Sequence, residues 1–291
     1  MLAVLEEGIL KMDVPVQRKV RPILAFLANF VSLGLGYVYV GEPRLAAIIV
    51  GGYFGLWAFF SWTRLIVSSV IAYWFLAGLA GVVMVVSVVH PAVIAFRNRR
   101  RPQTRYNRWW FYLLWILAIG TLAYSAVQDR AEILGYEPFR TPTESMSPTL
   151  ERGDFFMADT WHFHHHPPML GEIVVFERPD EPHVKYVKRV VAVPGDTIKG
   201  RNGVLYRNGQ VINEPYVHAP NPDPGYARDF GPNILGKDDV FVLGDYRNNS
   251  LDSRTWGAIP IRNLHGRAQF VWFSWGNAGV RWNRLGISLR R

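Results

Sequence analysis

Long apolar stretches without a charged side chain dominate residues 1–127. Three of these stretches, residues 45–62, 65–89 and 109–127, are 18 to 25 residues long, which is the length that an α-helix needs to cross the hydrocarbon core of a bilayer. A fourth stretch, residues 22–41, is interrupted by polar residues and three glycines, so it fits either a re-entrant segment or a fourth span. The pattern predicts an N-terminal membrane domain with about three transmembrane helices.

From Tyr136 onward the pattern changes to short apolar or alternating runs separated by Gly, Pro and Asp. Such runs predict β-strands, and no apolar stripe of helical spacing lies among them. The dipeptide Asn208-Gly209, placed between Leu205 and Val211, predicts a tight hairpin. Residues 128–291 are therefore expected to form a mainly β domain. The predicted strands cover residues 171–176, 184–193, 204–206, 240–243 and 269–273.

The charge distribution follows the same division. Residues 1–127 carry 12 Lys and Arg against 4 Asp and Glu, whereas residues 128–291 carry 20 against 19, so nearly all of the net charge of +9 belongs to the apolar half. Basic residues that flank uncharged stretches are typical of membrane anchors and argue against a nucleic-acid partner. The chain has no cysteine, which excludes disulfides and cysteine-based metal or redox sites.

A cluster of arginines between the last two apolar stretches predicts the orientation in the membrane. Short loops rich in Lys and Arg remain in the cytoplasm, so the final helix is expected to run outward and to place the β domain on the extracytoplasmic side. The basic N-terminal segment is expected to be cytoplasmic as well. The arginines of the cluster, which has no acidic residue, are Arg97, Arg99, Arg100, Arg101, Arg105 and Arg108.

Lys188 is the most informative candidate for chemistry. In a strand, Lys188 shares one face with Val184, Tyr186 and Val190. Burial among apolar side chains disfavours the ammonium form and lowers the pKa of a lysine, which makes the amine a competent base near neutral pH. The alternative is a lysine at a strand edge whose charged end reaches solvent.

Other polar residues are ambiguous when taken singly. Ser145 lies before a Ser-Pro turn, where a turn residue or helix N-cap is common. The polar run at residues 244–257 does not have the spacing of a calcium loop. A purely structural role stays open, in which Asp252 and Arg254 form an ion pair and Asp245 caps a turn. The histidines at positions 162 and 164–166 are expected to lie in a surface loop without a metal.

Taken together and in order, these segments resemble the bacterial type I signal peptidases, also called leader peptidases. The resemblance extends from Tyr136 to about Pro260. Glu144 departs from the family, whose members often have Gly there, and the N-terminal helices exceed the one or two spans common in the family. The matching blocks are residues 136–139, 145–150, 171–176, 186–191 with 194–196, and 244–257.

The resemblance implies a serine endopeptidase that uses a Ser/Lys dyad and no cofactor or metal. Ser145 matches the nucleophile and Lys188 the neutral general base. Ser250 matches the serine that orients the lysine, and Thr143 falls at the position of the hydroxyl that stabilises the oxyanion. Three further residues are expected to brace the site, namely Asp245, Asp252 and Arg254.

The resemblance also implies the substrate and the location. The substrate would be the end of a signal peptide on an exported preprotein, with small residues at the first and third positions before the cut, typically Ala-x-Ala. The peptide would pair as an added strand near Pro142. The other partner would be the lipid bilayer, in a bacterial cytoplasmic (inner) membrane. The shallow substrate pocket is expected to be lined by Thr141, Pro142, Leu150, Tyr186 and Val187.

Two alternative functions stay open at this point. One is a specialised relative that processes a single dedicated secreted or conjugation protein, and the other is a non-catalytic membrane scaffold.

Overall fold

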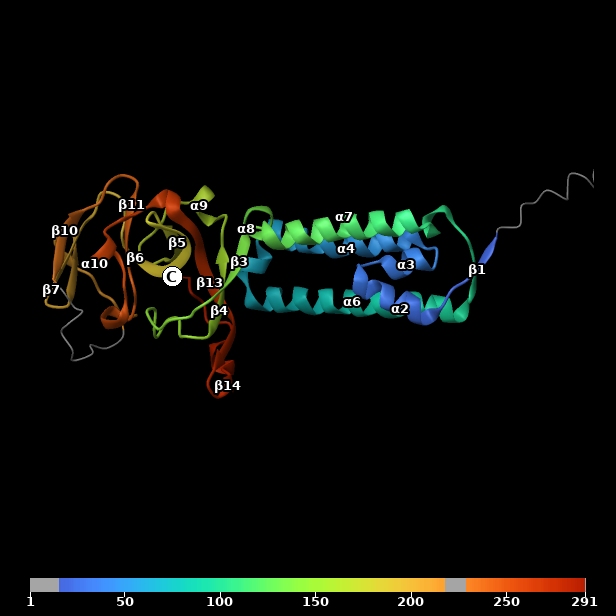
Figure 1. Cartoon of the computed structure of the whole chain (residues 1–291). Helices are drawn as coiled ribbons and strands as arrows, with labels where there is room; N and C mark the ends of the chain where they lie inside the picture. Colours follow the sequence, from blue (N-terminus) through green and yellow to red (C-terminus); the bar gives the residue numbers. More distant parts are fainter. Residues whose placement is uncertain (1–15, 218–228, 291) are drawn as a thin grey trace, which may run out of the picture. The chain divides into compact units, whose positions relative to one another are not determined.

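The computed structural model describes residues 16–217 and 229–290, which fold as two compact units. The first unit contains the described residues through Phe59 together with Phe75–Gln128. The second contains Phe60–Trp74 and the chain from Asp129 onwards. Helices make up most of the first unit and strands most of the second (Figure 1).

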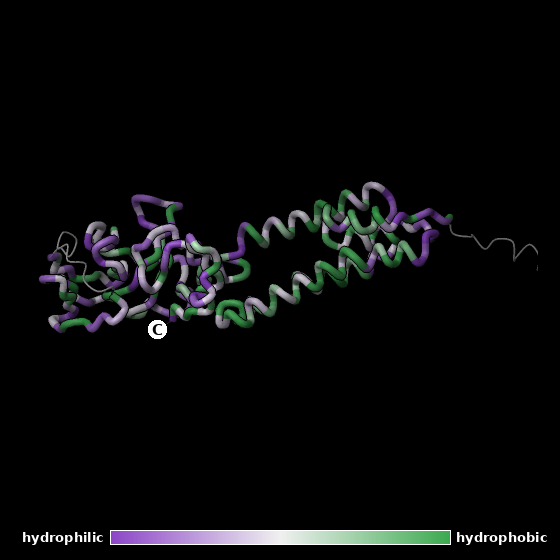
Figure 2. The backbone as a smooth tube through the Cα atoms, turned by 90° about the horizontal axis from the view of Figure 1, so that it is seen from below, coloured by the Kyte–Doolittle hydropathy of each residue, from purple (hydrophilic) through white to green (hydrophobic). Residues whose placement is uncertain are grey.

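Three helices are long and apolar enough to cross a membrane, namely α4 (Pro43–Trp62), α6 (Val70–Arg97) and α7 (Trp109–Gln128). Helices α4 and α7 follow the predicted stretches closely. Helix α6 begins later than predicted, because residues 65–68 form the separate short helix α5 (Leu65–Ser68) and Ser69 is extended. Apolar residues line all three helices along most of their length (Figure 2).

Residues 22–41 form two short helices, α2 (Pro22–Val31) and α3 (Leu35–Tyr39). At a rise of about 1.5 Å per residue, α2 is only about 15 Å long, half of a bilayer core. The buried Asn29 ties the pair together, because its Nδ2 donates to the Ser87 carbonyl over 2.8 Å and its Oδ1 accepts from the Gly36 amide over 3.2 Å. This geometry corresponds to a packed helical hairpin, not to a straight span.

A small two-stranded sheet joins the N-terminal segment to the loop between α6 and α7. Its strands, β1 (Gln17–Lys19) and β2 (Arg100–Pro102), pair antiparallel with Arg18 opposite Arg101. The short helix η1 (Arg105–Asn107) follows in the same loop. The pairing places the basic residues before α2 and those after α6 at the same end of the helices.

The second unit is the mainly β domain that the sequence predicts. Its larger sheet has eight strands in the order β12-β11-β6-β5-β13-β4-β3, with β14 paired to β13, and its smaller sheet has the order β10-β7-β8-β9. The strands of the larger sheet are β3 (Tyr136–Arg140), β4 (Asp154–Asp159), β5 (Ile173–Arg178), β6 (Glu181–Ala192), β11 (Asp239–Leu243), β12 (Ile259–Pro260), β13 (Leu264–Gly276) and β14 (Gly279–Val280). Those of the smaller sheet are β7 (Thr197–Arg201), β8 (Val204–Arg207), β9 (Gln210–Val211) and β10 (Phe230–Ile234).

The predicted hairpin is present between β8 and β9. Arg207 pairs with Gln210, and the two residues between them have φ values of 52° and 82°. Positive φ at both positions is the requirement of the turn that Asn-Gly favours. Short helices connect the remaining strands, namely α8 (Arg130–Ile133), α9 (His162–His165), α10 (Ser253–Trp256), η2 (Arg247–Asn249), η3 (Ile261–Asn263) and η4 (Trp282–Arg284).

The two faces of β5 belong to different parts of the core. Ile173 and Val175 pack on one side, whereas Val174 and Phe176 pack on the other. Met146 and Leu150, from the segment after β3, are fully buried in the first of these clusters. Alternation along β5 therefore anchors residues 141–150 on one face of the sheet. On the other face it provides apolar contacts for Val190 of β6.

Candidate active site

The segment that carries Ser145 is held at both of its ends. At its start, the Thr141 amide donates to the Asp154 carbonyl over 2.8 Å, and the Thr141 carbonyl accepts from the Gly153 amide over 2.9 Å. Directly after Ser145, the buried side chain of Met146 fixes the chain in the core. Ser145 is itself 8% exposed, so the hydroxyl sits at the boundary between core and surface.

Lys188 lies opposite Val174 in the β5–β6 pair and is 4% exposed. Its Nζ donates to Ser145 Oγ over 2.9 Å and to the carbonyl of Val187 over the same distance. The structure therefore brings together the two residues whose proximity the sequence could not establish.

The surroundings of Lys188 favour a neutral amine. Burial lowers the pKa of the Lys188 ammonium from 10.5 to about 8, although the carboxylates of Asp252 and Asp245 act in the opposite direction. The Arg254 guanidinium contributes further to the lowering. Because desolvation is the largest effect, a substantial fraction of Lys188 is unprotonated near pH 8.

Thr143 lies beside the serine hydroxyl, with its Oγ1 3.3 Å from Ser145 Oγ. Thr143 is exposed, so its hydroxyl is accessible from outside the domain. The Thr143 hydroxyl and the backbone amide of Ser145 are two hydrogen-bond donors of the same short segment, and donors of this kind can stabilise an oxyanion.

Ser250 is close to the site, but it does not orient Lys188 through a hydrogen bond in this structure. Its Oγ is buried and has no hydrogen-bond partner within the described residues. A side chain at Gly244 would collide with both Ser250 Oγ and the Ser145 carbonyl oxygen. The absence of a side chain at Gly244 thus allows the Ser250 loop to approach the segment that carries Ser145.

Asp245 connects the strand of the lysine to the segment of the serine. The carboxylate is fully buried and accepts from Arg189 Nε over 2.8 Å and from Arg189 Nη2 over 2.6 Å. Its Oδ2 also accepts from Thr149 Oγ1 over 2.5 Å. The sequence predicts a bracing role for Asp245 but not for Arg189 or Thr149, although Arg189 directly follows Lys188.

Asp252 and Arg254 form the ion pair that the sequence left open. Arg254 Nε donates to Asp252 Oδ1 over 2.8 Å, and the buried carboxylate also accepts from the Gly244 amide over 3.0 Å. Arg254 Nη2 donates to the Arg247 carbonyl over 2.7 Å. These contacts close the loop that follows β11.

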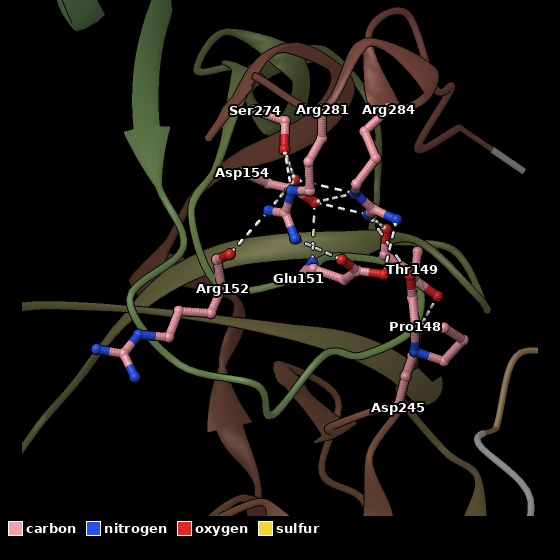
Figure 3. Close-up of polar contacts among 9 residues, drawn as sticks. All are labelled: Pro148, Thr149, Glu151, Arg152, Asp154, Asp245, Ser274, Arg281 and Arg284. Atoms are coloured by element: carbon pink, nitrogen blue, oxygen red, sulfur yellow. Dashed lines mark hydrogen bonds and ion pairs between the residues drawn. The ribbon is translucent and has the colours of Figure 1, made fainter. Parts of the chain in front are cut away.

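A second network braces the same segment and also includes Thr149 (Figure 3). The fully buried Asp154 accepts from Arg284 Nη2 over 2.6 Å and from Ser274 Oγ over 2.7 Å. Arg281 reaches the same carboxylate at 3.1 Å. Arg284 Nη2 also donates to the Thr149 carbonyl over 3.0 Å. Sequence analysis missed this network, because its members lie about 130 positions apart.

The predicted substrate-pocket residues have different environments. Pro142 is exposed, and Val187 is partly buried against Met146 and its neighbours. Thr141 is buried, and Leu150 has no exposed surface. Both residues therefore pack inside the domain next to Ser145, and neither lines an open pocket. Tyr186 packs on Phe176 and Trp256.

The expectation that the histidines lie in a surface loop is wrong for His162. This residue begins α9 and is 7% exposed, and its Nε2 lies 3.2 Å from Oε1 of the buried Glu172. The ring of His166 stacks on it, with the centroids 4.9 Å apart. This contact was not predicted from the sequence, because Glu172 reaches His162 only through the fold. No group of metal-binding side chains is found within the described residues.

Comparisons with known proteins agree with this geometry. The family described as signal peptidase, peptidase S26, matches residues 112–275. A probable signal peptidase I of Synechocystis sp. is 40% identical over 158 residues, covering 52% of this chain and 76% of the relative. Signal peptidase I of Pseudomonas aeruginosa is 30% identical over 234 residues, covering 64% and 78%.

A signal peptidase I crystal structure from Enterococcus faecalis is 27% identical and covers 35% of this chain and 97% of that one, with a TM-score of 0.32, which is too low to inform the fold. The family match covers more than half of the sequence and contains every proposed site residue. The chain therefore belongs to the signal peptidase family, peptidase S26.

Proposed function

We propose that this protein is a membrane-bound serine endopeptidase that removes signal peptides from exported preproteins. The observation that carries the proposal is the 2.9 Å contact between Lys188 Nζ and Ser145 Oγ in buried surroundings. A lysine whose pKa is lowered to about 8 is suited to deprotonate a serine without a histidine. A non-catalytic scaffold, by contrast, would not need a buried lysine beside a serine hydroxyl.

The reaction would proceed by acyl transfer. The neutral amine of Lys188 accepts the Ser145 hydroxyl proton while Oγ bonds to the scissile carbonyl carbon. The Ser145 amide and Thr143 Oγ1 donate to the oxyanion. The Lys188 ammonium then protonates the leaving amine as the C–N bond breaks. Lys188, neutral again, deprotonates a water molecule that adds to the acyl carbon. The C–Oγ bond then breaks, Lys188 returns the proton to Ser145 Oγ, and the signal peptide leaves with a free carboxylate.

An open backbone edge is available for the substrate. Among the described strands, β11 pairs with β6 only from Arg189 onwards, so the part of β6 before Arg189 has a partner strand on one side only. Lys188 lies at the end of this open edge. An extended peptide would add to the edge as a strand, with Pro142 on the exposed segment nearby, and would present its scissile bond to Ser145.

The small-residue preference of the family, Ala-x-Ala, would follow from limited space next to that edge. Val187 and Pro142 are the aliphatic residues of the predicted pocket that keep exposed surface. Small side chains before the cut would fit against them, whereas larger ones would overlap.

The helices support a three-span anchor in a bacterial cytoplasmic membrane. β1 and β2 pair, which places the N-terminal segment and the arginine-rich loop at one end. Residues 60–74 belong to the unit of the β domain, which fits three crossings with residues 128–291 as an extracytoplasmic catalytic domain. The positive-inside rule then puts the arginine-rich end in the cytoplasm.

Substitution of the two reacting groups tests the proposal. Ser145→Ala and Lys188→Ala are each expected to lower kcat/KM for a preprotein by about 10³-fold or more, since either change removes the nucleophile or its base. Lys237→Ala, at an exposed lysine outside the site, serves as the matched control. Cleavage of a panel of preproteins by the full-length protein in detergent is the measurement. Near-normal cleavage by a folded Ser145→Ala or Lys188→Ala variant would contradict the proposal.

A further inference from the structure

A cavity of about 600 Å³ lies within the second unit, and its lining shares no residue with the proposed active site. It is bounded by the connection between α4 and α6, by the segment around α9 and by β13. Cationic and aromatic side chains dominate its lining, notably Trp62, Arg64, Trp161, His166, Arg267 and Arg290. None of these residues takes part in the proposed peptidase reaction.

The positive charges of the cavity are only partly compensated. Arg64 forms an ion pair with Asp159, and Arg267 pairs with the buried Glu172 over 2.9 Å. Arg290 is different, because it has no carboxylate partner within the described residues.

The contacts of Arg290 are all with neutral groups. Its Nε donates to Gln269 Oε1 and its Nη2 to the Val67 carbonyl, each over 2.6 Å. Burial and the nearby Arg267 lower the pKa of the Arg290 guanidinium, against the opposing effect of Asp159. A cation held by neutral acceptors beside a second cation leaves a favourable position for an anion.

Chain connectivity gives the depth of the cavity in the membrane. Trp62 is the last residue of α4 and is 76% exposed, and the Val67 carbonyl that binds Arg290 lies in the connection to α6. If α4 and α6 cross the bilayer, this connection emerges at the headgroup layer, where exposed tryptophans are enriched. The cavity then opens where phosphate groups of lipids are concentrated.

We propose that this cavity binds the phosphate headgroup of an anionic phospholipid on the extracytoplasmic leaflet. Arg290 donates to the phosphate, Arg64 and Arg267 add positive potential, and the exposed ring of Trp62 lies against the lipid. The inference rests on the proposed membrane-bound state. A bound lipid would therefore contact both the α4–α6 connection and β13, the longest strand of the larger sheet.

Native mass spectrometry of the full-length protein in detergent tests the site. The Ser145→Ala variant is used, so that lipid binding is read without turnover. Phosphatidylglycerol is expected to bind about tenfold more tightly than zwitterionic phosphatidylcholine, as a charge-assisted contact predicts. Arg290→Gln is expected to abolish this preference and Arg290→Lys to retain most of it. Arg262→Gln, at an exposed arginine of η3 away from the cavity, is the matched control and should bind as the parent does.

Three results would overturn the proposal. Equal binding of the two lipids by the parent protein is one, and an unchanged preference in Arg290→Gln is another. The third is displacement of phosphatidylglycerol by inorganic phosphate at equal concentration, which would identify a free-phosphate site. Should Arg290→Gln not fold, the lipid comparison on the parent and on Arg290→Lys decides. The two proposals fail separately. Loss of the lipid preference would not change the cleavage results for Ser145 and Lys188, and a negative cleavage result would not change lipid binding.

Discussion

The amine of Lys188, the proposed general base, lies in buried surroundings with only 4% of the residue exposed. A buried lysine without a carboxylate in direct contact costs stability as long as it is protonated. Lys188 carries this destabilisation, and its Nζ lies 2.9 Å from Ser145 Oγ. At that position a neutral amine could accept the serine proton. Function and stability are therefore expected to depend on the same proton.

Lys188→Met is expected to stabilise the β domain at pH 7. The folded pKa of about 8 lies below the unfolded value of 10.5, so the unfolded state binds the proton more tightly. Folding of the wild type is therefore penalised below pH 8, and the penalty disappears as the pH rises to 10.5. The shift corresponds to about 3 kcal/mol at full effect.

Urea unfolding of the β domain in detergent, followed by tryptophan fluorescence, measures this difference. Lys188→Met should exceed the wild type in free energy of unfolding at pH 7, and the gap should shrink between pH 8 and pH 10.5. Lys237→Met, at an exposed lysine, is the control. A gap that does not change with pH would mean that Lys188 is not held neutral by the fold.

At the scale of elements, the short helix η4 contacts the segment that carries Ser145, although the two lie about 130 positions apart along the chain. Arg284 is 9% exposed at its side chain and binds both the buried Asp154 and the Thr149 carbonyl. Arg281 contacts the same carboxylate but is 26% exposed. The two arginines form a natural pair of test and control.

Arg284→Met is expected to destabilise the β domain by about 3 kcal/mol, because it removes one partner of a buried ion pair and leaves Asp154 with fewer donors. It should also lower kcat/KM, because Arg284 then no longer binds the Thr149 carbonyl in the segment that follows Ser145. Arg281→Met should have the smaller effect on both. Thermal unfolding and peptide cleavage measure the two effects, and an equal or larger effect of Arg281→Met would contradict the bracing role of η4.

Local patterns predicted much of the β domain. Alternation located β5, β6, β8, β11 and part of β13, and the dipeptide Asn208-Gly209 located a hairpin whose φ values match its turn. The sequence did not predict β3, β4 or the network around Asp154, because those depend on partners that only the fold brings near. His162 illustrates the same limit, since Glu172 becomes its neighbour through packing. Short-range chemistry was predictable, and long-range pairing was not.

At the scale of the whole molecule, two independent contacts constrain the proposed topology. The pairing of β1 with β2 links the two basic segments, and the Arg290 bond to the Val67 carbonyl links the α4–α6 connection to the β domain. Both are satisfied by three crossings with a cytoplasmic N-terminus. An even number of crossings would put one pair of partners on opposite sides of the membrane.

Because the chain has no cysteine, single substitutions can report the topology cleanly. In intact cells, a membrane-impermeant maleimide is expected to label Arg262→Cys and Ser68→Cys but not Arg100→Cys, all three positions being exposed. Permeabilised cells should label all three, which controls for reactivity. Labelling of Arg100→Cys in intact cells would reverse the proposed orientation.

The most direct test of the central claim is a titration of Lys188 itself. The chain contains only six lysines, so carbon-13 labelling of the lysine side chains gives a small set of NMR signals, and Lys188→Arg identifies the one of interest. The full-length protein in detergent should show a Lys188 midpoint near pH 8, well below the other lysines. A midpoint near 10.5, with Lys188 still an ammonium at pH 9, would contradict the proposal that it serves as the base for Ser145.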